Sequence, residues 1–435
     1  MIGEIWASNE TSENISYLTE ELENRFSGTP QEREAAEYVK GKLEEYKLDN
    51  PTLESFDILG WKRGETHLSL HCASEIELDC IALPYSPSKN VEAEIVDLGY
   101  GLEEDFEENV EGKIVLVNNE TPEYKGRTVH RGEKYLQAVE GGASAFVYQN
   151  TTPGNLPSTG SLGSNKLGPI PGIAISKETG DKIRRISSDG EIQKASISVK
   201  AESGNSTSQN VYASVSGDNN KKKSEILLGG HLDGHDISPA AEDNASGTTT
   251  LLEVARVLSK HRDLLGSKIR FVSFGSEEMG LVGSKEYTKA HNLDNINLMI
   301  NMDGVGVARE PKVITCKTDY IPGLVDKVSS YLHYPLDIED YISPLSDHWS
   351  FLRKGVPVCY LFPNSKTSGR GWSHTPMDTL DKVKVKDVKE SAMIVALLLI
   401  ELSNLEKSFP RPNPETVKKN LEERGLKKQL EWFKD

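Results

Sequence analysis

Acidic and histidine side chains follow successive apolar runs in the second half of the sequence. The candidate ligands are His231, Asp243, Glu278, Asp303 and His374. Zinc in catalytic sites takes histidine nitrogens and carboxylate oxygens, with one position left open for water. Two such ions held close together can share a bridging carboxylate and activate a common water molecule. These residue types therefore indicate a two-metal hydrolase.

A second carboxylate directly precedes one of these ligands. Glu277 stands next to Glu278 in the sequence. In such a pair, one carboxylate can be committed to a metal ion while its neighbour stays free to move a proton. The pair therefore suits hydrolysis by an activated water molecule.

The elements expected around these residues alternate between strands and helices. Apolar runs predict strands at 211–216, 225–229, 268–274, 297–302, 312–316 and 356–362, and helical periodicity predicts helices at 247–260, 280–290, 321–332 and 385–402. This alternation is typical of a parallel α/β sheet, in which ligands bind beyond the carboxyl ends of the strands. The candidate ligands stand at these ends or in adjacent loops.

Each candidate ligand, taken alone, also has a structural explanation. A histidine after a strand is commonly a hydrogen-bonded structural residue, Asp243 could cap the helix that follows it, and Glu278 could favour a helix start. Asp303 precedes a glycine and could form a turn. Five such residues at successive strand ends are much harder to explain separately. His235 and Asp236 are expected to be loop structure.

The pattern of apolar, turn-forming and charged residues divides the chain into three parts. Residues 1–50 and 205–408 carry a helical start and the alternating pattern, and form the predicted main domain with the candidate ligands. Residues 51–204 hold short β-type runs with one helix near 134–141, which predicts an inserted, β-rich α/β domain. Residues 409–435 are charged, with apolar residues spaced for a surface helix, and form the predicted C-terminal helical tail.

The overall composition argues against several classes of partner. The 435 residues include 67 acidic and 50 basic side chains, which gives a formal net charge of −17. A phosphate-binding surface needs clustered lysine and arginine, so nucleic acid is not an expected partner. No run of about 18 apolar residues predicts a membrane span. The first residues show no signal peptide, so the expected location is cytoplasmic.

Taken in chain order, the motifs around the candidate ligands resemble metallopeptidase family 28. The motifs are GHLD at 230–233, DNASG at 243–247, EEMGLVGS at 277–284, NMD at 301–303, SDH at 346–348 and HTPMDT at 374–379. The family comprises co-catalytic zinc aminopeptidases, with carboxypeptidases and glutaminyl cyclases among their relatives. The run GGASA at 141–145 resembles part of the protease-associated insert that some members carry.

The resemblance implies both a fold and a metal content. The fold would be a mixed, mostly parallel central sheet flanked by helices, of the zinc aminopeptidase and phosphorylase/hydrolase type, with the inserted β-rich α/β domain. Two zinc ions per chain would be bridged by Asp243 and by a water or hydroxide. His231 and Asp303 would complete one zinc site, and Glu278 and His374 the other.

Family position also implies roles for the neighbouring residues. Glu277 would be the general base, which takes a proton from the zinc-bound water and returns it to the leaving amine. Asp233 would support catalysis by accepting a hydrogen bond from the far nitrogen of His231. Asp347 and His348 would lie on the substrate side or support the site.

The activity that the resemblance implies is removal of the first residue from peptides with a free N-terminus. A zinc carboxypeptidase or dipeptidase is the alternative; it needs a basic pocket, for which Arg353 and Arg370 are the obvious candidates. A non-catalytic, receptor-like member usually lacks ligands, and here all five are present. Glutaminyl cyclases generally use a single zinc. Ser373 stands where some members place a tyrosine that assists the oxyanion.

Overall fold

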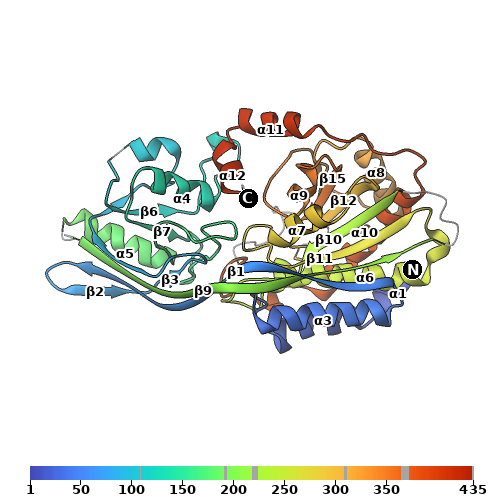
Figure 1. Ribbon diagram of the computed structural model, residues 1–435, viewed down its shortest axis with the longest axis horizontal. Coiled ribbons are helices and arrows are strands. Elements are labelled where there is room, and N and C mark those ends of the chain that lie inside the picture. The colour runs from blue at the N-terminus through green and yellow to red at the C-terminus, as the bar shows by residue number, and fades with distance from the viewer. Residues whose placement is uncertain (108, 191–193, 218–223, 308–310, 364–371, 434–435) are drawn as a thin grey trace. The chain divides into compact units, whose positions relative to one another are not determined.

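The computed structural model describes residues 1–107, 109–190, 194–217, 224–307, 311–363 and 372–433, which belong to two compact units (Figure 1). The first unit consists of Met1–Asp57, Thr207–Ser373 and Asp378–Gly425, and the second of Ile58–Ser206, His374–Met377 and Leu426–Asp435. Each unit buries a hydrophobic core of its own. Strands β1 (Asp49–His71) and β9 (Lys194–Val215) each contribute residues to both units.

The first unit is built on a mixed sheet with the strand order β14-β13-β15-β12-β10-β11-β9-β1. Its other strands are β10 (Glu225–His231), β11 (Lys268–Phe274), β12 (Ile296–Met302), β13 (Lys312–Ile314), β14 (Ile338–Glu339) and β15 (Val358–Phe362). The central strands β15, β12, β10 and β11 are parallel, whereas β13 and β9 run antiparallel to their neighbours β15 and β11. The predicted mixed, mostly parallel sheet is confirmed.

Helices cover both faces of this sheet. They are α1 (Ile2–Ala7), α2 (Glu10–Ser16), α3 (Pro30–Glu45), α6 (Ser246–Lys260), α7 (Val282–Ala290), α8 (Ile321–Leu332), α9 (His348–Leu352), α10 (Val385–Asn404) and α11 (Pro414–Glu423). Helices α6 and α10 contact each other and β10 over the main core. On the other face, Phe274 of β11 packs against Tyr287 of α7 and Phe351 of α9. The alternation of side chains along β11 explains this division, because Phe271 faces the main core.

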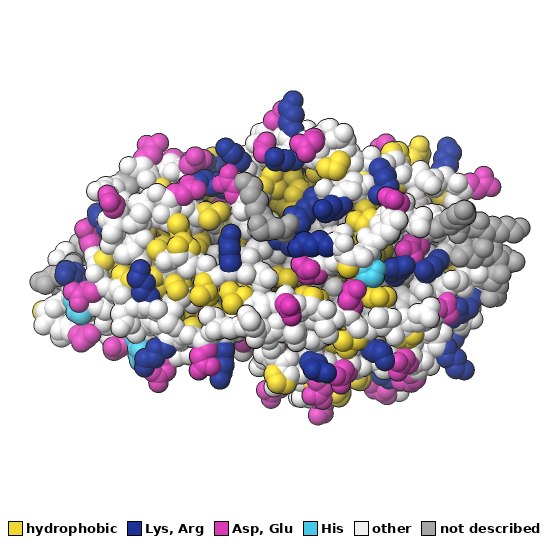
Figure 2. Space-filling view, viewed as in Figure 1, with side chains coloured by type: hydrophobic (Ala, Val, Ile, Leu, Met, Phe, Trp, Pro, Cys, Tyr) yellow, Lys and Arg dark blue, Asp and Glu magenta, His cyan; other side chains and the backbone are white. Residues whose placement is uncertain are grey.

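Helix α3 of the N-terminal segment begins with a capping residue followed by a proline. Pro30 is the first residue of α3, and the Thr29 hydroxyl accepts a hydrogen bond from the Glu32 backbone N–H. Buried Ala35 and Val39 join the main core, while the exposed side of α3 carries both acidic and basic side chains, which form ion pairs (Figure 2). The helix is therefore held by its buried stripe and its cap.

The second unit contains a smaller sheet with the order β3-β8-β7-β6-β5. The strands of this sheet are β3 (Ile81–Ala82), β5 (Ile95–Asp97), β6 (Ile114–Asn118), β7 (Ala145–Gln149) and β8 (Gly172–Ile175). The unit also contains β2 (Glu75–Leu78) and β4 (Lys89–Ala93), which pair with β1 and β9, and the helices α4 (Arg131–Glu140), α5 (Lys177–Ser188) and α12 (Lys427–Trp432). Strands β5 to β8 are parallel, and β3 is antiparallel. The predicted β-rich α/β insert is confirmed, but it contains two helices, α4 and α5, where the sequence predicted one near 134–141.

The C-terminal tail forms two short helices, α11 and α12, where the sequence predicted a surface helix. Gly425, with φ of +77°, separates α11 from α12. By its contacts α11 groups with the first unit, whereas α12 groups with the second and packs on α4. Among the described helices, none combines the length and the apolar character that crossing a bilayer requires.

Candidate active site

Three parallel strands bring the candidate ligands of the first unit to one edge of its sheet. His231 is the last residue of β10, paired in register with Phe274 of β11. Glu278 follows four residues after Phe274, and Asp303 directly follows the end of β12. Asp243 lies in the turn Ala241–Ala245 just before α6, where its own backbone is not helical (φ −120°, ψ 83°). Parallel strands end on the same side, so residues distant in sequence converge there.

The ligand atoms of this cluster are close enough to share a metal ion. His231 Nε2 lies 3.1 Å from Asp243 Oδ1 and 3.8 Å from Asp303 Oδ1. One ligand atom each of His231, Asp243 and Glu278 lie within 4.8 Å of one another, and all three residues are buried. These distances describe a compact set of one nitrogen and three carboxylates.

This donor set fits zinc. Two ligand atoms at about 2.1 Å from a tetrahedral zinc ion lie about 3.4 Å apart, between the two distances from His231 Nε2. His231 Nε2 is buried and makes no hydrogen bond. Several carboxylates in one buried space repel one another unless a cation lies among them. His231, Asp243, Glu278 and Asp303 are thus suited to hold a divalent cation.

Asn244 fixes the strand ends and the start of α6 relative to one another. Its amide Nδ2 donates to the backbone carbonyls of His231 (3.3 Å) and Met302 (3.0 Å). Its Oδ1 accepts from the backbone N–H groups of Gly247 and Gly304, at 3.0 and 3.1 Å. One buried amide therefore joins β10, β12 and α6 around the cluster, and sequence reasoning gave it no role.

Asp243 is held from both its backbone and its side chain. Asp378 accepts hydrogen bonds from the backbone N–H groups of Glu242 (2.7 Å) and Asp243 (3.1 Å). The Ser373 hydroxyl donates to Asp243 Oδ2 at 2.8 Å. Burial raises the pKa of Asp378 to about 6, although the two backbone donors oppose this shift. The sequence singled out Ser373 as a departure from the family, and the structure places it on the predicted bridging ligand.

Asp233 connects His231 with the pair Glu277 and Glu278. Its carboxylate accepts hydrogen bonds from the backbone N–H groups of Glu277 (2.9 Å) and Glu278 (3.1 Å) and from the Ser27 hydroxyl (2.9 Å). His231 Nδ1 lies 3.1 Å from the backbone carbonyl of Asp233 and 3.6 Å from its Oδ1. The far nitrogen of His231 thus faces Asp233 as expected, with the backbone carbonyl as the nearer acceptor.

Glu277 lies beside the cluster and is buried. Burial raises the pKa of Glu277 well above its usual range; the His231 charge opposes this, and the carboxylates of Glu278 and Asp347 add to it. A buried carboxyl group with a raised pKa binds a proton more readily than an exposed one. The environment of Glu277 therefore suits a group that accepts and returns protons.

The two residues predicted on the substrate side differ in their surroundings. Asp347 is buried, and its pKa is raised to about 7 by burial, with the charge of His231 opposing the shift. His348 Nε2 lies 2.8 Å from the Ser343 carbonyl, and its ring stacks on Tyr360 with centroids 4.2 Å apart. Asp347 therefore interacts electrostatically with the charged residues of the cluster. His348 instead hydrogen-bonds to the backbone and stacks on Tyr360.

His235 and His374 were expected to play different parts, and the structure places them as follows. His235 Nε2 lies 2.9 Å from Oε2 of the predicted ligand Glu278. From the sequence, His235 was expected to be only loop structure. The signal for it was its position four residues after His231. His374 groups with the second unit, where its Nδ1 lies 3.3 Å from the Thr159 carbonyl. Its part in metal binding stays a prediction.

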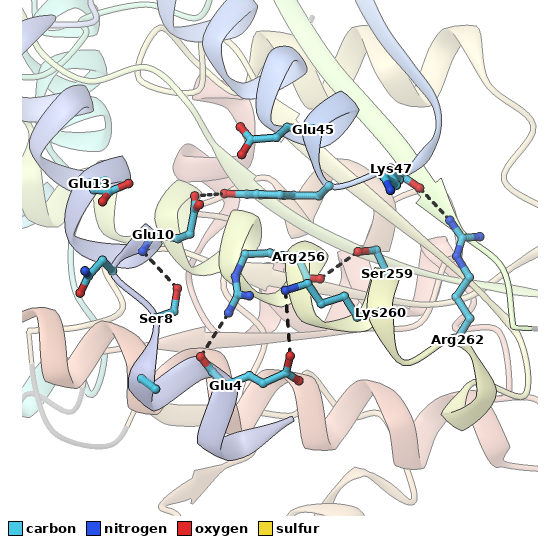
Figure 3. A pocket seen from close by; sticks show the side chains of 13 residues that line it. Glu4, Ser8, Glu10, Glu13, Glu45, Lys47, Arg256, Ser259, Lys260 and Arg262 are labelled. Atoms are coloured by element: carbon cyan, nitrogen blue, oxygen red, sulfur yellow. Dashed lines mark hydrogen bonds and ion pairs between the residues drawn. The ribbon is translucent and has the colours of Figure 1, made fainter.

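A separate cavity of about 790 Å³ lies in the first unit between α1, α2, α3 and the C-terminal end of α6 (Figure 3). Arg256 donates to the Glu4 carbonyl, and Lys260 pairs with the Glu4 carboxylate. The Tyr46 hydroxyl donates to Glu10. Among the described residues that line it, none is a predicted site residue. The cavity is lined by paired charges, whereas the candidate ligand Asp243 lies at the other end of α6.

The fold and the buried cluster of metal-type ligands define a metal-dependent α/β hydrolase. Residues 210–399 match the model of peptidase family M28, and residues 91–183 match the PA domain. Residues 210–399 are therefore an M28 peptidase region, of a family of metal-dependent hydrolases, and residues 91–183 are a PA domain. The predicted family and its insert are confirmed.

Relatives align along nearly the whole chain. Aminopeptidase YwaD of Bacillus subtilis (strain 168) is 28% identical over 94% of this chain and 86% of its own length. The solved structure of BSAP, a zinc aminopeptidase from Bacillus subtilis, has a TM-score of 0.71 at 26% identity, covering 92% of this chain and 95% of that chain. Carboxypeptidase Q of Xenopus laevis is 26% identical over 93% of this chain and 88% of its own length.

Proposed function

We propose that this protein is a metallo-aminopeptidase that uses two zinc ions and removes the first residue of peptides. The observation that carries the proposal is the buried cluster of His231, Asp243, Glu278 and Asp303, with Glu277 beside it. The similarity to BSAP, which is described as a zinc aminopeptidase, supports both zinc as the metal and the aminopeptidase reaction.

The chain has the donors for two ions. His231 and Asp303 would hold one ion and Glu278 and His374 the other, with Asp243 between them, as the family motifs imply. When bound, the zinc ions would make a water molecule more acidic and polarise the carbonyl group that it attacks. The buried carboxylates would set the positions of both ions.

The protein's own residues would carry the proton. Glu277 would take a proton from the attacking water and pass it to the nitrogen of the leaving amine. Asp233 holds the backbone N–H of Glu277 and that of Glu278, so it fixes the base relative to the neighbouring ligand. The buried position of Glu277 keeps competing water away from this proton transfer.

The charge of the site favours an amino end over a carboxyl end. Glu277, Asp303 and Asp347 add buried carboxyl groups around the centre. In their ionised forms these groups attract a free α-ammonium group and repel a terminal carboxylate, and the zinc ions would offset part of this charge. A carboxypeptidase is the second candidate, supported by the likeness to carboxypeptidase Q. For its basic pocket, Arg353 lies partly buried just after α9, and Arg370 lies outside the described residues.

Activity on paired substrates tests the direction of cleavage. The wild-type protein should hydrolyse leucine p-nitroanilide, lose this activity with a chelator and regain it with zinc. Acetylation of the leucine amine should abolish hydrolysis because the ammonium group is lost. Cleavage of an N-blocked dipeptide with a free carboxyl end, and not of leucine p-nitroanilide, would instead establish the carboxypeptidase.

Glu277→Gln tests the proton carrier. The substitution keeps the shape of the side chain but removes its basicity, so kcat should fall by about 10²–10⁴-fold while zinc content stays at the wild-type value. Asp326→Asn, at an exposed position of α8, is the matched control and should keep full activity. A fully active Glu277→Gln enzyme would rule out Glu277 as the base.

A further inference from the structure

The second unit holds the segment of His374 through a reciprocal pair of hydrogen bonds. The Thr159 N–H donates to the His374 carbonyl at 2.8 Å, and His374 Nδ1 lies 3.3 Å from the Thr159 carbonyl. His374 has a φ of +61°, a left-handed conformation that residues other than glycine seldom adopt. Its backbone and its ring are therefore both tied to the loop between β7 and β8.

This contact decides which imidazole nitrogen of His374 can bind a metal. A carbonyl oxygen can only accept a hydrogen bond, so Nδ1 must carry the proton when it bonds to Thr159. Nε2 then keeps its lone pair and is the nitrogen available as a ligand. A partner of this kind fixes both the tautomer and the direction of a histidine ligand.

Arg131 holds the loop that carries Thr159. Its Nη1 donates to the Thr159 carbonyl at 3.2 Å, and its Nε and Nη2 each donate to the Ser161 carbonyl at 3.3 Å. The guanidinium group also lies over the Tyr148 ring, 5.9 Å from the centroid. The planar fork of an arginine can hold two carbonyl groups in a fixed relation, which a lysine cannot do.

Gly160 makes this arrangement possible. It lies between the two carbonyls that Arg131 holds and has a φ of +138°. A Cβ atom placed there would lie 2.1 Å from Arg131 Nη2, so any side chain would displace the guanidinium group. Arg131 is itself buried at the first position of α4, where the helix fixes its backbone. The loop, the arginine and the glycine form one rigid support.

We propose that Arg131 is a positioning residue for the metal centre: it fixes the Thr159 carbonyl, which orients the imidazole of His374 so that Nε2 can bind zinc. This inference rests on the proposed two-zinc function, because it gives His374 the role of a ligand.

Zinc affinity of the metal-free protein is the measurement that tests this proposal. Competition with a chromogenic zinc chelator resolves the two ions in the full-length wild-type protein and in Arg131→Met, Arg131→Lys and Gly160→Ala. Arg184→Met, which removes a guanidinium group paired with Asp97 on the same unit, is the matched control. Absorption of the cobalt(II)-loaded proteins reports the geometry around the metal.

The expected result concerns one ion of the two. Arg131→Met and Gly160→Ala should weaken one zinc ion by about 10–100-fold and leave the other unchanged, with an altered cobalt spectrum. Arg131→Lys keeps the positive charge and most of the aliphatic side chain, so this variant should fold and show a smaller loss of zinc affinity. Arg184→Met should match the wild type in all respects.

Two other outcomes have distinct meanings. If folded Arg131→Lys and Gly160→Ala bind both ions with wild-type affinity and give the wild-type cobalt spectrum, the positioning role is overturned. If the wild-type protein itself binds fewer than two zinc ions, the proposed function fails first, and the comparison among variants no longer concerns His374 as a ligand.

Discussion

Replacement of Asp233 by asparagine should weaken both the fold and the metal centre. The carboxylate of Asp233 accepts hydrogen bonds from the backbone N–H groups of Glu277 and Glu278, at 2.9 and 3.1 Å, each on a different oxygen. Asparagine has one carbonyl oxygen, so its amide NH₂ group must face one of these two donors. The side chain is fully buried, and water cannot take its place.

The size of the effect follows from these contacts. A buried N–H group left without an acceptor costs about 1–3 kcal/mol. The side chain also lies 3.6 Å from His231 Nδ1 and holds the backbone of the predicted ligand Glu278. Because the backbone carbonyl of Asp233 still accepts from His231 Nδ1 in the variant, zinc affinity should fall by about tenfold, at the lower end of the range for residues that orient ligands. The Ser27 hydroxyl can rotate and still bond to the amide, so it should add little.

Urea unfolding of the metal-free protein separates the two parts of this prediction. Asp233→Asn should lower the free energy of unfolding of the first unit, and zinc titration should show the loss in affinity. Asp326→Asn, which makes the same chemical change on the surface of α8, should do neither. If both variants unfold at the same urea concentration and bind zinc equally well, Asp233 does not hold the loop in the way that its contacts indicate.

Three further predictions concern proton release, helix packing and helix propensity. Burial lowers the pKa of His231, but Glu277 and the other nearby carboxylates outweigh it and raise this pKa well above its usual value in the metal-free protein. Zinc must displace that proton when it binds His231. Zinc affinity measured between pH 6 and 8 should therefore fall as the pH falls, by about tenfold per pH unit for each proton released. An affinity that does not change with pH would contradict this prediction. Gly132→Ala places a Cβ atom 2.5 Å from the Trp432 ring and should destabilise the second unit by about 1–3 kcal/mol. Gly41→Ala, in open space on α3, should instead stabilise the first unit by about 0.5–1 kcal/mol. Thermal unfolding of both glycine variants and the wild type measures these two changes.

The sequence was sufficient to predict the elements that carry the site. Apolar runs followed by polar residues predicted β10, β11 and β12, and the structure has these strands within one or two residues of the expected bounds. The helix predicted at 385–402 is α10, Val385–Asn404. Local periodicity determines such elements because each needs only a buried face and suitable ends. Parallel strands then bring His231, Glu278 and Asp303 to one edge.

Contacts between distant loops could not be read from that periodicity. His235 was interpreted as loop structure, yet its ring meets Glu278 across two loops whose paths depend on the packing around them. The contact between Thr159 and His374 joins residues 215 positions apart. No local pattern encodes such a pair, because neither residue lies in a helix or strand that would set its direction.

The amino-acid sequence by itself thus determined the family, the α/β class and the candidate ligands, because these follow from residue types at the ends of locally encoded elements. The tertiary structure decided which groups support those ligands: Asn244 between the strand ends, Asp378 and Ser373 on Asp243, and Arg131 on the loop of Thr159. The physical reason is that a hydrogen bond depends on positions within a few tenths of an ångström. Such precision arises only when the whole chain is packed.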